Sequence, residues 1–135
     1  MTRLQRLYQR AEALGLQVYF LPLQARRGIS TPDGAIGMDP DRQESAAAEA
    51  VCLAHEMGHC VTGSFYTAEA GRIERLRCEA RAQRWAYDAL VPLEELRRLL
   101  RQGVTRPDEL AEHFDVTEGF LRECLDYYKN TKNAI

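Results

Sequence analysis

The chain has no apolar run long enough to cross a lipid bilayer, since a membrane-spanning helix needs about 20 predominantly apolar residues. Its longest apolar runs, residues 18–23 and 46–53, are too short or too interrupted. Arginines occur near the amino terminus, but no apolar segment follows them as it would in a secretion signal. We therefore expect a cytoplasmic protein that does not contact membranes.

A strong excess of charge of either sign is also absent, because the formal net charge is -2 over 135 residues. The chain therefore lacks the electrostatic footprint of a nucleic-acid-binding protein. Residues 109–121 do have the rhythm of a helix-turn-helix, which makes a DNA-binding module one alternative. However, between Asp108 and Asp126 seven acidic residues stand against Arg122 alone, and phosphate contacts need the opposite sign. We expect no direct contact with nucleic acid and interpret these helices as a cap on the core or a docking surface.

Paired cysteines of the C-x-x-C type are missing as well, which argues against a zinc ribbon or a thioredoxin-like motif. The four cysteines are Cys52, Cys60, Cys78 and Cys124, and a reducing cytoplasm would keep them as free thiols. Cys60 and Cys78 flank the candidate metal-binding segments and are alternative ligands. We favour buried apolar roles for them, because free cysteine is among the most buried residue types.

Histidine is scarce, yet two of the three histidines lie in one pentapeptide, His55-Glu56-Met57-Gly58-His59. In a helix, two histidines four residues apart project from one face, so both can bind a single metal ion. Glu56 is rotated off that face, where it can take a proton from a water held by the metal. Gly58 costs about 1 kcal/mol of helix propensity against alanine. A small residue there would let another backbone approach closely, which would offset that cost.

A catalytic zinc ion usually has three protein ligands and an open position for water. The remaining histidine, His113, does not fit the spacing of a metzincin, so the third ligand should be a carboxylate. The candidates are Glu69, Glu74, Glu79 and Asp88. Glu79 is the best of them because it shares a helix face with Ala82 and Ala86, which suits close packing against Gly58. A carboxylate on such a face is costly unless it is paired or binds metal.

Helix and strand signals are mixed along the chain, which predicts an α+β fold with a small antiparallel sheet. We expect strands at residues 17–23 and 35–38, with 29–31 as a hairpin partner. Start signals in residues 39–44 open a helix that runs through His59. Further helices are predicted at residues 3–14, 73–91, 93–101, 107–114 and 117–128. We expect a single domain over 1–135, with the sheet and active-site helix in 1–62 and the third-ligand helix and C-terminal helices in 63–135.

Three segments of the chain together resemble the ImmA/IrrE family of metallo-endopeptidases. They are AHEMGHC at residues 54–60, TGSFY at 62–66 and EARAQRWA at 79–86, the last closing at Leu90-Val91-Pro92. The resemblance covers most of the chain, although H-E-x-x-H alone is shared by many unrelated peptidases. One departure is Gln83, where the family usually has asparagine. If this side chain orients a metal ligand, its longer amide would shift that ligand slightly.

The resemblance implies a compact zincin-like fold, similar to the catalytic core of thermolysin. It also implies Zn²⁺ on His55, His59 and Glu79, with Glu56 as the general base and no other cofactor. Members of the family typically cleave helix-turn-helix repressors of prophages or mobile elements, which would make this chain an anti-repressor. The alternative is a metal-binding regulator that sequesters a repressor without cutting it, since its ligands would look the same.

Peptide hydrolysis passes through a tetrahedral oxyanion, which needs a hydrogen-bond donor beside the metal. Tyr66, Tyr87 and His113 are the candidates, and the sequence does not choose among them. A core or surface role is the simpler interpretation of His113, which stands beside Phe114. The predicted strand at residues 35–38 is expected to pair with an extended substrate, as edge strands do in peptide recognition.

Overall fold

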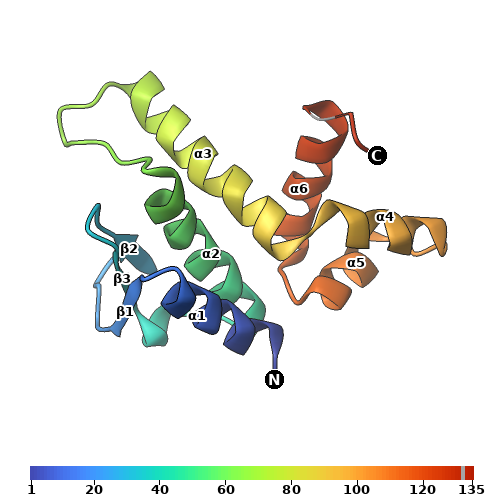
Figure 1. Cartoon of the computed structure of the whole chain (residues 1–135), viewed down its shortest axis with the longest axis horizontal. Helices are drawn as coiled ribbons and strands as arrows, with labels where there is room; N and C mark the ends of the chain where they lie inside the picture. The colour runs from blue at the N-terminus through green and yellow to red at the C-terminus, as the bar shows by residue number, and fades with distance from the viewer. Residues whose placement is uncertain (132) are drawn as a thin grey trace.

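The computed structural model describes residues 1–131 and 133–135. Within them, six α-helices, three strands and one short 3-10 helix form an α+β fold, as predicted (Figure 1). In chain order these are α1 (Arg3–Ala13), β1 (Gln17–Phe20), β2 (Gly28–Ser30), β3 (Ala35–Met38), η1 (Pro40–Arg42), α2 (Ala46–Thr62), α3 (Arg72–Leu90), α4 (Leu93–Arg101), α5 (Pro107–Phe114) and α6 (Glu118–Asn130). Among the described residues, no helix is both long and apolar enough to span a membrane.

The small sheet is mixed, not antiparallel as predicted. Its strand order is β1-β3-β2, with β1 parallel and β2 antiparallel to β3. Three consecutive residues of β3, including Ile36 and Met38, are buried, so this strand occupies the centre and both of its edges are paired. The expectation that residues 35–38 form an edge strand was therefore wrong. The free edges belong to β1 and β2.

The helix that carries the pentapeptide begins later than the start signals in residues 39–44 predicted. The Asp39 carboxylate accepts hydrogen bonds from the backbone N–H groups of Leu23 (2.9 Å) and Asp41 (3.0 Å). It thereby ties the turn η1 to the preceding loop instead of opening a long helix. Ser45 caps α2, because its Oγ accepts a hydrogen bond from the N–H of Ala48 at 3.0 Å.

The two long helices α2 and α3 lie side by side and pack closely against each other (Figure 1). At their closest point, Gly58 faces Ala82, and a Cβ placed on Gly58 would lie 2.3 Å from the Ala82 carbonyl oxygen. Ala82 and Ala86 are fully buried in this contact. The prediction that Gly58 provides clearance for the helix carrying Glu79 is confirmed.

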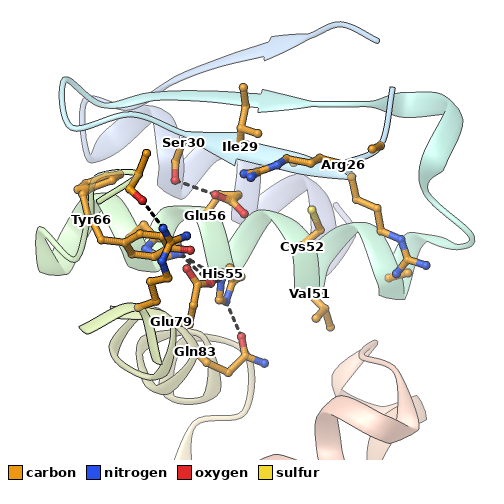
Figure 2. A pocket seen from close by; sticks show the side chains of 18 of the residues that line it. Arg26, Ile29, Ser30, Val51, Cys52, His55, Glu56, Tyr66, Glu79 and Gln83 are labelled. Carbon is orange, nitrogen blue, oxygen red and sulfur yellow. Dashed lines mark hydrogen bonds and ion pairs between the residues drawn. The ribbon is translucent and has the colours of Figure 1, made fainter. Parts of the chain in front are cut away.

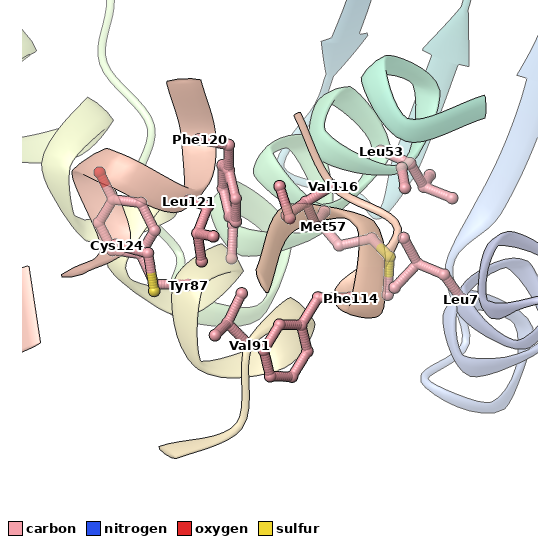
Figure 3. Close-up of a cluster of buried hydrophobic side chains, with 14 of the residues drawn as sticks. Leu7, Leu53, Met57, Tyr87, Val91, Phe114, Val116, Phe120, Leu121 and Cys124 are labelled. Atoms are coloured by element: carbon pink, nitrogen blue, oxygen red, sulfur yellow. The ribbon is translucent and has the colours of Figure 1, made fainter. Parts of the chain in front are cut away.

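The hydrophobic core continues from this helix pair into the C-terminal helices. Figure 3 shows Leu53 and Met57 of α2 in the same cluster as Val91, Phe114 and side chains of α6. Near the end of α6, the hydroxyl of Tyr128 donates to the Val91 carbonyl at 2.7 Å. These contacts anchor α3 at its carboxyl end and so hold Glu79 in place relative to α2.

Candidate metal centre

Three side chains from two helices converge on one point, as Figure 2 shows for His55 and Glu79. Oε1 of Glu79 lies 2.9 Å from Nε2 of His55 and 3.3 Å from Nε2 of His59, and the two Nε2 atoms are 3.2 Å apart. Tetrahedral zinc bonds of about 2.1 Å would separate ligand atoms by about 3.4 Å. The spacing of the three atoms therefore fits a single ion between them.

The second nitrogen of each imidazole is held by an acceptor, which fixes the tautomer. Nδ1 of His59 donates to the backbone carbonyl of Ser64 at 2.5 Å, and Nδ1 of His55 donates to Oε1 of Gln83 at 2.7 Å. A neutral imidazole protonated at Nδ1 has its lone pair on Nε2. Two lone pairs and a carboxylate oxygen then face one another, and this set of three acceptors suits a cation.

The carbonyl that holds His59 is placed by the end of α2. Gly63 adopts the left-handed conformation (φ 65°) and ends the helix, with its N–H bonded to the His59 carbonyl. The chain then turns back, and the N–H of buried Ser64 also donates to the His59 carbonyl, at 3.1 Å. The same turn that terminates the helix therefore orients the His59 side chain on its last turn.

Glu56 lies off the converging face and toward the sheet, as the pentapeptide spacing predicted. Its Oε1 accepts a hydrogen bond of 2.7 Å from the hydroxyl of Ser30 at the end of β2 (Figure 2). Gly28, on the same strand, leaves room for this approach, since a Cβ there would lie 2.8 Å from the Cys52 Sγ and 3.3 Å from the Glu56 Cγ. The sequence analysis did not identify Ser30, because its partner is 26 residues away.

The convergence point opens into a cleft of about 1000 Å³ between β2 and the start of α3. His59 is nearly buried, with 7% of its side chain exposed, whereas 41% of the Glu79 side chain is exposed. The cleft is lined by both histidines, Glu56, Glu79 and all three residues of β2, together with residues of the loop after α2. An ion at this point would have protein on one side and access for water and a peptide on the other.

The chain matches the model of a known protein family. The model of the IrrE N-terminal-like domain (Peptidase_M78), a peptidase family, matches residues 11–126. The chain belongs to this family. No curated protein and no solved structure matches it. The match confirms the family resemblance carried by the three sequence segments.

Gln83, at the position where the family resemblance predicted asparagine, faces the candidate metal centre. Its longer amide reaches Nδ1 of His55 from the same helix that carries Glu79 (Figure 2). The two side chains are four residues apart and therefore lie on neighbouring turns of α3. In this chain, glutamine thus makes the contact that holds His55 in its tautomer.

Of the three candidate oxyanion donors, only Tyr66 lies in the cleft. Tyr66 lines the cleft, and its hydrogen bond to Glu79, followed by burial, raises its pKa, so it is a protonated donor at neutral pH. Tyr87 is buried against α6, where burial and then Glu123 raise its pKa to about 12. Nε2 of His113 lies 3.0 Å from Oε1 of Glu95. Neither His113 nor Tyr87 lines the cleft.

Among the described residues, the three-ligand group contains none of the other ligand candidates. Asp88 is exposed, accepts a hydrogen bond from Tyr128 at 3.1 Å and does not line the cleft. Cys60 contacts the Thr31 carbonyl, and burial, with Glu56 next in importance, raises the pKa of its thiol. A raised thiol pKa keeps Cys60 protonated, whereas metal binding needs the thiolate.

Proposed function

We propose that this IrrE N-terminal-like domain is a zinc-dependent endopeptidase. The observation that carries the proposal is the convergence of the metal-binding atoms of His55, His59 and Glu79, beside Glu56 in an open cleft. Two histidines and one carboxylate with an open position are the ligand set of catalytic zinc in thermolysin-like peptidases. A closed structural zinc site would instead have four protein ligands.

Each residue then has a defined task in hydrolysis. When bound, zinc would lower the pKa of a water and polarise the scissile carbonyl. Glu56, held by Ser30, accepts the proton of the attacking water and passes it to the leaving amine. Tyr66, the candidate donor on the cleft wall, donates a hydrogen bond to the oxyanion. Gln83 and the Ser64 carbonyl keep the two imidazoles in the tautomer that leaves Nε2 free.

The substrate backbone is proposed to bind along β2. On the side that faces β3, the Arg27 carbonyl accepts a hydrogen bond from the Asp39 N–H, and the Thr31 N–H donates to the Ala35 carbonyl. Because successive residues of a strand direct their N–H and C=O groups to opposite sides, the N–H and C=O groups of Gly28 and Ser30 point away from β3. This free edge lies along the cleft, so an extended peptide can add to the sheet there. In this proposal β2 takes the role that the sequence analysis gave to residues 35–38.

The proposed substrate is a helix-turn-helix repressor of a prophage or mobile element, as the family resemblance implies. The test uses the purified chain, Zn²⁺ and the repressor encoded nearest to its own gene, with products identified by mass spectrometry. We expect discrete fragments, no cleavage after chelation, and renewed cleavage when zinc is restored. Release of operator DNA with the repressor intact would instead support the sequestering regulator. An unaffected repressor that still binds its operator would exclude both.

Replacing Glu79 with alanine is expected to lower zinc affinity more than about 100-fold, because even loss of an outer partner of a ligand costs 10–100-fold. Zinc content after dialysis and competition with a chromophoric chelator measure the effect. Glu74→Ala is the matched control, since Glu74 is an exposed acid on the same helix. Unchanged zinc content in Glu79→Ala would remove Glu79 from the site.

Replacing Ser30 with alanine is expected to lower kcat about tenfold with zinc content and KM unchanged. The hydroxyl orients Glu56 through one hydrogen bond of 2.7 Å and does not bind the metal. Steady-state kinetics on a cleavable peptide measure the split between kcat and KM. Ser30→Thr keeps the hydroxyl on a strand residue and should restore most of the rate. Equal kcat for wild type and Ser30→Ala would exclude this positioning role.

A further inference from the structure

The outer side of α3, opposite the helix pair contact, carries large aliphatic side chains in solvent. Ile73 is 66% exposed and Leu76 is 56% exposed. A shallow groove runs along this side and is lined only by residues of α3: Ile73, Leu76, Arg77, Ala80, Arg81 and Arg84. We call these six residues the α3 face. Their spacing of three and four residues places them in one row, about 16 Å long at 1.5 Å per residue.

The apolar row is flanked by arginines that have no hydrogen-bond or ion-pair partner among the described residues. Arg77, Arg81 and Arg84 belong to the α3 face, and Arg72 is exposed at the start of the helix. In the part of the chain that the structure describes, none of these four side chains forms a hydrogen bond or an ion pair, whereas Arg75 on the inner side bonds to the carbonyls of Ala68 and Ala70. The positive charge of the α3 face is therefore available to an external partner.

The arginines are arranged in a way that is electrostatically unfavourable for the helix that carries them. Arg77 and Arg81 are four residues apart, and Arg81 and Arg84 three apart, which are spacings at which like charges repel. Arg72 lies at the positive end of the helix dipole, where a cation is unfavourable. Contacts among the described residues therefore account neither for this cluster of positive charge nor for the two exposed aliphatic side chains beside it.

We propose that the α3 face is a docking site for an acidic amphipathic helix of a partner protein. An apolar centre with arginines around it is the composition of a protein interface. A straight groove along one helix fits the apolar side of a second helix, with acidic residues at its edges meeting the arginines. Phosphate binding would not need Ile73 and Leu76, and two aliphatic side chains without an aromatic anchor are too few for a membrane surface.

The test uses a stapled helical peptide with leucines at helical spacing flanked by glutamates, and fluorescence anisotropy with the full chain. We expect saturable binding that Ile73→Ser/Leu76→Ser and Arg77→Glu/Arg81→Glu each weaken at least about tenfold. A peptide with lysines in place of the glutamates should bind the charge-reversed variant better than the wild type. Arg98→Glu/Arg101→Glu on α4 is the matched control and should leave binding unchanged, and circular dichroism verifies the fold of each variant.

Other outcomes would overturn the proposal. They are the absence of peptide binding, equal binding of a scrambled acidic peptide, and binding that the α3 variants do not weaken. The same holds if duplex DNA or anionic phosphatidylserine vesicles bind through the α3 face while the peptide does not, or if the face mediates only self-association in sedimentation velocity. None of these readouts depends on peptide hydrolysis, so the docking site and the proposed activity can fail separately.

Discussion

Glu56→Gln is expected to lower kcat/KM for peptide hydrolysis by about a thousandfold, while zinc affinity stays within about twofold of wild type. General acid–base catalysis contributes about 10²–10⁴-fold, and glutamine cannot accept the proton of the attacking water. Glu56 is not one of the three converging ligands, and its carboxylate is bonded to Ser30. The substitution therefore removes the base and retains the metal site.

The measurement is kcat/KM on the cleavable peptide, together with zinc affinity from chelator competition for the same protein preparation. Glu49→Gln is a suitable control, because Glu49 lies on the same helix but its carboxylate pairs with the Tyr8 hydroxyl away from the cleft. Hydrolysis by Glu56→Gln at the wild-type rate would show that Glu56 is not the base. If the variant binds a repressor and relieves repression as well as wild type does, cleavage is not the mechanism.

Gly58→Ala is expected to destabilise the protein by about 3 kcal/mol, although alanine is the better helix former by about 1 kcal/mol. The new Cβ would lie 2.3 Å from the Ala82 carbonyl oxygen and 2.9 Å from its carbonyl carbon. Both are backbone atoms in the middle of a helix, so rotation of a side chain cannot relieve the clash. The helices α2 and α3 must separate, which also moves Glu79 away from the two histidines and weakens metal binding.

Urea unfolding in the presence of a chelator measures this effect without the contribution of metal binding to stability. Gly119→Ala is the matched control, since Gly119 is helical in α6 and a Cβ there meets no atom within 4 Å. That variant should be as stable as wild type or slightly more stable. A Gly58→Ala protein with wild-type stability would mean that the two helices do not approach as closely as described.

Local signals in the sequence were enough to predict most of the helices and strands. The bounds of α4 and α5 agree with the predicted ranges, because each is set by neighbouring residues such as Pro92 and Pro107. The predicted start of α2 was wrong, because the Asp39 carboxylate accepts a hydrogen bond from Leu23, a residue 16 positions away, and does not cap α2. Strand order also depends on distant pairing, so the mixed sheet and the central place of β3 could not be read from the alternation of apolar residues.

The sequence by itself determined the proposed metal ligands, because the spacing of His55 and His59 on one helix and the small-residue face around Glu79 are local properties of two helices. It also determined that Gly58 must face another backbone. Only the tertiary structure decided which groups surround those residues and Glu56: Ser30 contacts Glu56, Gln83 and the Ser64 carbonyl contact the imidazoles, and Tyr66 lies on the cleft wall. Ser30 and Gln83 lie on other elements than the side chains they contact, so packing brings them within hydrogen-bonding distance, whereas the Ser64 carbonyl is placed by the turn that ends α2.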